Sequence, residues 1–270
     1  MKFGISAKPD VRNLAELVTR VEGVLGEGNE ILFDIDVAEV LGKDATPIEE
    51  MDVDIVVTIG GDGTILRAFQ RSDAKLLGIN AGVMGFLTEV KEEEIETSLA
   101  RVLRGEYSLD ERLKLKIYKD DDRLPDCLNE AVFHTAHVAK MRHFSISIDG
   151  HLADKFRADG VMVATPTGST SYAMSAGGPI IDPRVEAMTM VPLAPFKLSQ
   201  RPLVVPANSQ IEIKLVKPKE SLLVLDGQEI QNISGEEEVR ITVSENKARF
   251  IRFDKDFYAR YGEKFLSSIW

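Results

Sequence analysis

The sequence predicts an α/β protein in which a domain with a parallel sheet is followed by an antiparallel β-sandwich domain. In residues 1–111, short apolar runs alternate with helical stripes, the pattern of strands joined by helical crossovers. From residue 112 onward, apolar and polar residues alternate strictly and helical stripes are scarce. We therefore expect domains at 1–111 and 112–254 and a C-terminal helical segment at 255–270.

The elements of the first domain follow in order along the chain. A helix is expected at 11–25 because its apolar residues recur at helical spacing, and Gly26 and Gly28 end it. Strands are expected at 2–7, 31–37, 53–59 and 75–79, with further helices at 65–69 after a possible Thr64 cap and at 92–104.

The second domain is expected to consist of short strands. Asp149-Gly150 is a hairpin-type turn, and the acidic cluster at 120–123 is best explained as a solvated turn between two strands. Strands are expected at 113–117, 144–148, 211–215, 222–225, 239–243 and 249–253. The last segment, 257–270, has the spacing of a short helix that could fold back onto either domain.

Gly60-Gly61-Asp62-Gly63-Thr64 connects a buried strand to a helix. Such a turn lies at the carboxyl end of its strand, where open α/β sheets bind ligands, and its bare backbone with a helix N-terminus suits phosphate. Asp62 would repel phosphates, so it makes sense if it orients a hydroxyl group or holds a phosphate-bound metal. The alternative is a tight connection whose acidic residue faces water.

A second loop with several glycines, at 80–87, leaves the next strand of the expected sheet. Because the carboxyl ends of parallel strands share one edge of the sheet, the two loops should converge on one crevice. Phe86 would either line that crevice or belong to the core.

The segment 165–179 is rich in hydroxyl side chains and small residues and follows a buried strand. Buried hydroxyls need partners, and such a loop can lie flat against a planar polar ligand such as adenine, with Tyr172 as a stacking face. The alternative is a turn that satisfies its own backbone. Ser169 and Ser171 are poor candidates for a nucleophile, because neither lies in G-x-S-x-G.

Asn129-Glu130 is a polar pair inside an otherwise apolar strand. An asparagine can bind adenine through paired hydrogen bonds, and a carboxylate suits ribose hydroxyls. Two familiar motifs are missing from the sequence, the P-loop G-x-x-x-x-G-K-[ST] and a G-x-G-x-x-G that opens a βαβ unit. Phosphate must therefore be bound by another loop.

Composition narrows the possible functions. A net charge of −11 argues against non-specific binding of nucleic acid. The N-terminus has no apolar signal segment and no run reaches the ~18 apolar residues of a membrane span, so a cytoplasmic protein without a membrane partner is expected. One cysteine and four histidines give no metal-ligand pattern, so no protein-bound metal site is expected.

Four motifs together resemble the NAD kinases: Gly60 to Thr64, Asn129-Glu130, Arg157-Ala158-Asp159-Gly160 and the segment from Thr165 to Pro179. The first is shared with diacylglycerol, sphingosine and 6-phosphofructo kinases of the wider superfamily. The last, with its Thr-Pro-Thr-Gly-Ser-Thr-Ser-Tyr run, is highly specific. The resemblance spans nearly the whole chain and implies a Rossmann-like α/β domain followed by a β-sandwich.

The resemblance implies transfer of the γ-phosphoryl group of ATP to the 2′-hydroxyl of the adenosine ribose of NAD, giving NADP, with Asp62 at the catalytic-base position. It also implies a homodimer or homotetramer with shared sites, and Mg²⁺ delivered with ATP. Arg67 would contact a pyrophosphate. The other implied binding residues are Gly63, Asn129, Glu130, Lys140, Arg157, Asp159, Thr170, Ser171, Tyr172, Ala173, Met174, Ser175 and Gln228.

Two other functions remain open. The first is a lipid or sugar kinase of the same superfamily, which would keep Asp62 and change the acceptor. The second is a non-catalytic regulator that binds NAD(P), against which an intact Asp62 argues. For a NAD kinase, the sequence leaves open whether ATP or inorganic polyphosphate is the donor, whether NADH is accepted, and whether NADP phosphatase activity accompanies the kinase.

Overall fold

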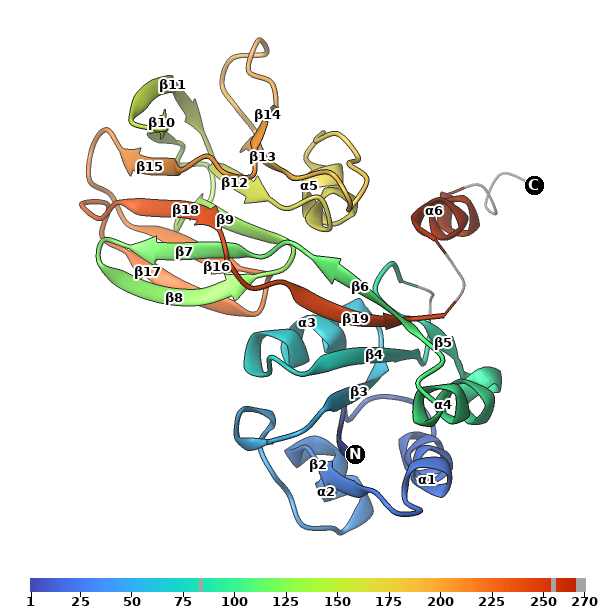
Figure 1. Ribbon diagram of the computed structural model, residues 1–270. Helices are drawn as coiled ribbons and strands as arrows, with labels where there is room; N and C mark the ends of the chain where they lie inside the picture. Colours follow the sequence, from blue (N-terminus) through green and yellow to red (C-terminus); the bar gives the residue numbers. More distant parts are fainter. Residues whose placement is uncertain (83–84, 254–255, 266–270) are drawn as a thin grey trace. The chain divides into compact units, whose positions relative to one another are not determined.

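The computed structural model describes residues 1–82, 85–253 and 256–265, and the chain forms two compact units (Figure 1). The first unit combines residues 1–111 with the chain from residue 248 onward, and the second is residues 112–247. Among the described residues, none of the helices is both long enough and apolar enough to cross a membrane.

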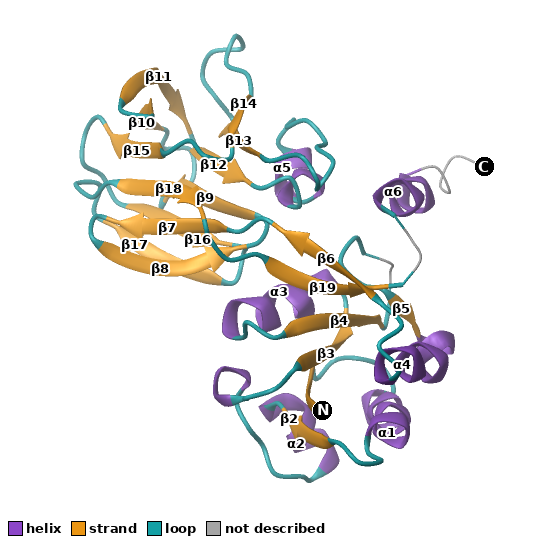
Figure 2. Cartoon of the chain, viewed as in Figure 1, coloured by secondary structure: helices purple, strands orange, loops and turns teal. Residues whose placement is uncertain are grey.

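The first unit is built on a largely parallel sheet with the strand order β2-β1-β3-β4-β19-β6, and β5 pairs with β4. Its strands are β1 (Lys2–Ala7), β2 (Glu30–Phe33), β3 (Ile55–Gly60), β4 (Lys75–Asn80), β5 (Val90–Lys91), β6 (Ser108–Arg112) and β19 (Ala248–Arg252). Its α-helices are α1 (Leu14–Leu25), α2 (Ile35–Leu41), α3 (Asp62–Arg71), α4 (Ile95–Leu103) and α6 (Phe257–Phe265), coloured purple in Figure 2.

Helices cover both faces of this sheet. Val57 of β3 belongs to the apolar cluster that includes α1 and α4. The next residue, Thr58, must point to the other face, and it pairs with Gly78 of β4. A Cβ atom on Gly78 would lie 2.5 Å from Ile65 of α3, so α3 packs closely against that second face. This is the arrangement that right-handed crossovers between parallel strands produce.

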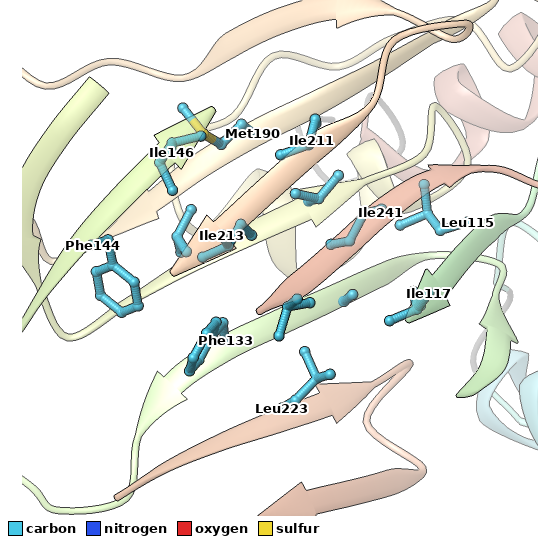
Figure 3. Close-up of a cluster of buried hydrophobic side chains, with 14 of the residues drawn as sticks. Leu115, Ile117, Phe133, Phe144, Ile146, Met190, Ile211, Ile213, Leu223 and Ile241 are labelled. Carbon is cyan, nitrogen blue, oxygen red and sulfur yellow. The ribbon is translucent and has the colours of Figure 1, made fainter. Parts of the chain in front are cut away.

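The second unit is a sandwich of two antiparallel sheets, with strand orders β11-β10-β15-β18-β7-β8 and β14-β13-β12-β9-β16-β17. The strands are β7 (Leu115–Lys119), β8 (Asp122–Cys127), β9 (Glu130–Thr135), β10 (Arg142–Ile148), β11 (His151–Ala158), β12 (Gly160–Ala164), β13 (Ala187–Leu193), β14 (Leu203–Pro206), β15 (Ile211–Leu215), β16 (Ser221–Leu225), β17 (Glu229–Ile233) and β18 (Val239–Val243). Their inward side chains form one core, in which Phe133 and Phe144 make an edge-to-face pair 5.6 Å apart (Figure 3).

The expected fold class is confirmed, but three local expectations were wrong. Residues 249–253 were expected in the sandwich, whereas β19 pairs with β4 in the parallel sheet. The strand expected at 31–37 ends at Phe33, because the buried Asp34 caps α2 by accepting a hydrogen bond from the Ile35 backbone. Helix α3 begins two residues before the expected Thr64 cap, after Gly61.

The C-terminal segment belongs to the first unit. Helix α6 covers residues 257–265 of the helix expected at 257–270, and residues 266–270 lie outside the described part of the chain.

Candidate functional site

The glycine-rich turn leaves the carboxyl end of β3 and runs directly into α3. Gly60 has a φ of 151°, and a Cβ atom there would lie 2.4 Å from the Thr64 hydroxyl oxygen. Glycine is therefore required at this position for both its conformation and its lack of a side chain. The turn places Asp62 in the first turn of α3, where the helix dipole favours a negative charge.

Asp62 is held by the second glycine-rich loop, which leaves the adjacent strand β4. Its carboxylate accepts hydrogen bonds from the backbone N–H groups of Phe86 at 2.8 Å, Leu87 at 3.0 Å and Thr88 at 3.3 Å. The two loops therefore meet at one edge of the sheet, as the sequence predicted. A carboxylate has about four lone-pair directions, so these bonds fix its orientation and leave about one direction for a further donor.

The close approach of Asp62 explains the glycine at position 85. A Cβ atom there would lie 1.9 Å from the nearer Asp62 carboxylate oxygen, so any other residue would push the carboxylate out of place. The next residue, Phe86, is 8% exposed and stacks on Phe257 of α6, with ring centroids 6.2 Å apart. Of the two roles left open for Phe86, the structure shows the packed one.

Arg67 lies one turn further along α3, and its guanidinium group is already engaged within the first unit. It donates to Asp36 at 2.6 Å, to the Ala7 carbonyl at 2.6 Å and to the buried Asp34 at 3.3 Å. These bonds tie α3 to the ends of β1 and α2. The side chain keeps 21% of its surface exposed, and its contact with a pyrophosphate stays a prediction.

In the second unit, Asn129 and Glu130 lie at the start of β9 and are fixed by Asp226. The Asp226 carboxylate accepts hydrogen bonds from the backbone N–H groups of Leu128 at 2.7 Å, Asn129 at 2.8 Å and Glu130 at 3.0 Å. Asp226 has a φ of 50° in the turn between β16 and β17, and the exposed Gln228 follows in the same turn. Sequence reasoning missed this role of Asp226.

Burial raises the pKa values of the two neighbouring carboxyl groups, those of Glu130 and Asp226. Burial and the neighbouring Asp226 charge raise the pKa of Glu130 to about 8, although a hydrogen bond from Ser171 opposes the shift. Burial likewise raises the pKa of Asp226 to about 6, against the three backbone N–H groups that favour its ionised form. One oxygen of the Glu130 carboxyl group is buried with no hydrogen-bond partner among the described residues. Such a group is available to a ligand.

The hydroxyl-rich segment packs against the same strand end. The Thr165 hydroxyl donates to the Leu128 carbonyl at 2.5 Å, and the Thr165 N–H donates to the Asn129 carbonyl at 2.8 Å. Ser169 is fully buried and bonds to the backbone at positions 166 and 181. Much of the hydroxyl content therefore satisfies the loop itself, which was the alternative explanation, and the loop in turn supports Asn129.

The later part of this segment, residues 170–175, has polar groups beside the Asn129 side chain that a ligand could reach. The Asn129 side-chain amide donates to the Ser171 hydroxyl at 3.4 Å. Thr170 and Ser171 are half-buried, and Tyr172 at the start of helix α5 (Tyr172–Ser175) is 47% exposed. Residues 170–175 thus bring the expected binding residues Thr170, Ser171, Tyr172, Ala173, Met174 and Ser175 to the end of β9 that carries Asn129 and Glu130.

Two other expected residues, Lys140 and Asp159, lie at the opposite end of β9. Asp159 precedes β12, and its carbonyl accepts a hydrogen bond from Thr135, the last residue of β9. Thr165 follows the far end of β12, six residues after Asp159, which corresponds to about 20 Å in an extended strand. Lys140 is exposed in the turn after β9. One copy of the second unit therefore does not gather all of its expected residues.

Arg157 lies near that same far end, beside Asp159. Its guanidinium group stacks on the ring of Phe196 at 4.9 Å, and both side chains line a cavity of about 330 Å³. Lys155 and Lys197 also line this cavity, so it is basic in an otherwise acidic chain.

Within the described residues, no group of three or more His, Cys, Asp or Glu side chains could hold a metal ion.

Comparison with known protein families explains the combination of motifs. Residues 33–107 match the model of the ATP-NAD kinase N-terminal domain, and residues 128–253 match that of the ATP-NAD kinase C-terminal domain. Together the two matches cover more than half of the chain. The chain belongs to the NAD kinase family.

Individual relatives within the NAD kinase family match the whole length of the chain. It is 47% identical to the NAD kinase of Methanothermobacter thermautotrophicus, with 98% of this chain and 96% of the relative covered. It is 45% identical to the NAD kinase of Thermococcus kodakarensis, with 99% of both chains covered.

Two solved structures of NAD kinase relatives share the fold. The crystal structure of an NAD kinase from Archaeoglobus fulgidus in complex with ATP has a TM-score of 0.83 and 30% identity, and covers 97% of this chain and 98% of its own. The crystal structure of yeast NADH kinase complexed with NADH has a TM-score of 0.90 and 25% identity, and covers 99% of this chain and 87% of its own.

Proposed function

We propose that this protein transfers the γ-phosphoryl group of ATP to the 2′-hydroxyl of the adenosine ribose of NAD, producing NADP. Family membership supports the reaction class, and the relatives crystallised with ATP and with NADH support the two substrates. The observation that carries the proposal is the position of the Asp62 carboxylate. It lies at the carboxyl edge of the parallel sheet, in one glycine-rich loop, and is fixed by backbone N–H groups of the other.

Asp62 is proposed to align the ribose hydroxyl and to accept its proton late in the reaction. Phosphoryl transfer proceeds through a loose transition state that requires little early deprotonation of the attacking hydroxyl. Positioning is therefore the main task of the carboxylate. Three backbone N–H groups hold Asp62 in one orientation and leave an accepting direction for the hydroxyl group.

NAD is proposed to bind the second unit through two sets of residues. Asn129, Glu130, residues 170–175 and Gln228 surround one end of β9 and suit the adenosine half of the molecule. The residues at the far end, Lys140, Arg157 and Asp159, would belong to a site shared with a second copy of the chain. Sedimentation velocity checks the homo-oligomer that this sharing requires, and a monomer that is fully active would contradict it.

Mg²⁺ is proposed to arrive with ATP. Oxygen atoms of phosphate groups are good ligands for this hard cation, and Mg²⁺ commonly uses few protein carboxylates when it is bound with a nucleotide. When bound, the cation would neutralise charge that develops on the transferred phosphoryl group. The cation would then be held mainly by the phosphate oxygens of ATP.

The direct test is NADP formation from NAD, with ATP and polyphosphate offered separately and NADH offered as an alternative acceptor. We expect product with ATP, no product when EDTA removes the divalent cation, and a loss of roughly 10²-fold in kcat for Asp62→Asn. A normal kcat in folded Asp62→Asn would refute the role of Asp62. If wild type gives no product with either donor but still binds NAD, the protein is a binding module instead.

A further inference from the structure

Strand β19 and helix α6 hold the loop at 86–89, whose backbone N–H groups position Asp62. We infer that Arg252 of β19 and Arg260 of α6 are positioning residues for phosphoryl transfer, acting through residues 86–89 on the Asp62 carboxylate. This inference rests on the proposed role of Asp62. All the contacts that support it lie within the first unit.

One peptide group connects Arg252 to Asp62 directly. The Leu87 carbonyl accepts a hydrogen bond from Arg252 Nη1 at 2.8 Å, and the N–H of Thr88, on the other side of the same peptide bond, donates to Asp62 at 3.3 Å. A peptide group is planar and rigid, so fixing its oxygen also fixes its N–H. A charged donor on the carbonyl also polarises the peptide group and strengthens the bond that its N–H makes.

Arg260 fixes the next peptide group of the loop. Its Nη1 donates to the Thr88 carbonyl at 2.6 Å, and the N–H of Glu89 donates to the Gly78 carbonyl of β4 at 2.8 Å. The loop is thus bonded on one side to the C-terminal arginines and on the other to Asp62 and the sheet. Movement of the loop toward solvent would break bonds on both sides at once.

Glu89 links Arg252 and Arg260 by forming an ion pair with each of them. Its side chain is 3% exposed and forms ion pairs with Arg252 at 3.1 Å and with Arg260, while Phe253 N–H donates to its other oxygen at 2.9 Å. Each arginine is itself 7% exposed. A buried ion cluster is strongly disrupted when one member is lost, because the remaining charges are left uncompensated.

Aromatic packing adds a contact at the beginning of the loop. Phe257 of α6 stacks on Phe86, and the ammonium group of Lys264 lies 4.4 Å from the centre of the Phe86 ring. The N–H of Phe86 makes the shortest of the three bonds to Asp62. Helix α6 therefore contacts Phe86 at the start of the loop and Thr88 and Glu89 at its end.

The decisive experiment compares Arg260→Met, Arg249→Met and Asp62→Asn in the full-length protein. Arg249 is the matched control, because it is an arginine of β19 that also donates to a loop carbonyl, that of Asp73. We expect Arg260→Met to lower kcat about tenfold, with the KM values for ATP and NAD within about twofold of wild type, since a misplaced catalytic group affects the transition state rather than binding. Arg249→Met should keep the wild-type kcat.

Two further measurements separate positioning from a general loss of stability. Amide hydrogen exchange should become faster at Phe86, Leu87 and Thr88 in Arg260→Met. In the double variant Asp62→Asn/Arg260→Met, kcat should equal that of Asp62→Asn within about twofold, because the arginine acts only through the carboxylate. If Arg260→Met does not fold, Phe257→Ala takes its place with an expected loss of a few-fold in kcat.

The results distinguish failure of the inference from failure of the proposed function. A wild-type kcat in folded Arg260→Met, or a double variant that loses the product of the two single losses, would overturn the positioning role while Asp62→Asn remains impaired. If Asp62→Asn itself is unimpaired, the proposed role of Asp62 fails first.

Discussion

The carboxyl groups of Glu130 and Asp226 are both buried beside the backbone that carries Asn129. Asn129 and Glu130 could be found from the sequence, because a polar pair interrupts an apolar strand there. Asp226 could not, because its three partners lie almost a hundred residues away and an aspartate in a turn normally needs no explanation beyond the turn.

Stability should depend on pH through Glu130. Its pKa in the folded protein is raised to about 8, so the folded state binds this proton more tightly than the unfolded chain does. The resulting stabilisation is complete below the ordinary pKa of 4.5 and is lost as the pH rises through about 8. We expect the temperature of half-unfolding to decrease as the pH is raised from 6 to 8 and to level off above 8, as measured by circular dichroism at constant ionic strength.

The variant Glu130→Gln should flatten this slope, because glutamine stays neutral throughout the range. Glu236→Gln is the control, since Glu236 is an exposed glutamate of the same unit. An unchanged slope in Glu130→Gln would show that another group causes the pH dependence.

Among the elements, the loop at 165–171 and the start of β9 depend on each other for position. Alternation and β-branched residues predicted most of the strands, because each buries one face. They could not assign 249–253 to a sheet, since the pattern of a strand does not name its neighbours. The ends of β2 and α3 were also misplaced, because the side chain of Asp34 and the conformation of Gly61 decide them.

Replacing Gly168 with alanine tests the contact between these elements. A Cβ atom there would lie 2.2 Å from the Asn129 carbonyl oxygen and 2.6 Å from its carbonyl carbon, and backbone cannot yield as a flexible side chain can. We expect Gly168→Ala to lower the free energy of unfolding by about 1–3 kcal/mol and to raise the KM for NAD. Urea unfolding and steady-state kinetics measure the two effects.

The same substitution at Gly23 provides a control with the opposite sign. Gly23 lies inside α1, and a Cβ atom there would meet nothing within 4 Å. Gly23→Ala should raise the free energy of unfolding by about 0.5–1 kcal/mol without affecting the KM for NAD. Equal effects at the two positions would mean that the contact with Asn129 is not the cause.

At the scale of the whole molecule, the first unit is discontinuous in sequence and the second is not. Strand β19 lies between β4 and β6 in the sheet, so the chain must complete the sandwich before it returns to the sheet. The change from helical to alternating patterns predicted the boundary after residue 111. The sequence allowed a C-terminal helix that folds back onto either domain, but it did not predict the return of the strand at 249–253, whose pairing with β4 joins segments more than 170 residues apart.

Fragments of the chain should differ in their ability to fold. Residues 112–247 contain both sheets of the sandwich and one continuous core, so we expect cooperative thermal unfolding of this fragment. Residues 1–111 lack β19 and leave Glu89 without Arg252 and Arg260, so we expect no cooperative transition. Joining residues 1–111 to 248–270 through a flexible linker should restore it. Cooperative unfolding of 1–111 alone would contradict this account.

The position of β19 also has a consequence for synthesis on the ribosome. The strand emerges only after the whole sandwich has been translated, and domains generally fold as units while the chain grows. A nascent chain that has just exposed Asp62 cannot yet hold it in place, because β19 and α6 are still to be made. Termination directly after residue 247 would therefore release a protein that contains the whole second unit but lacks β19 and α6, the elements that hold the loop around Asp62.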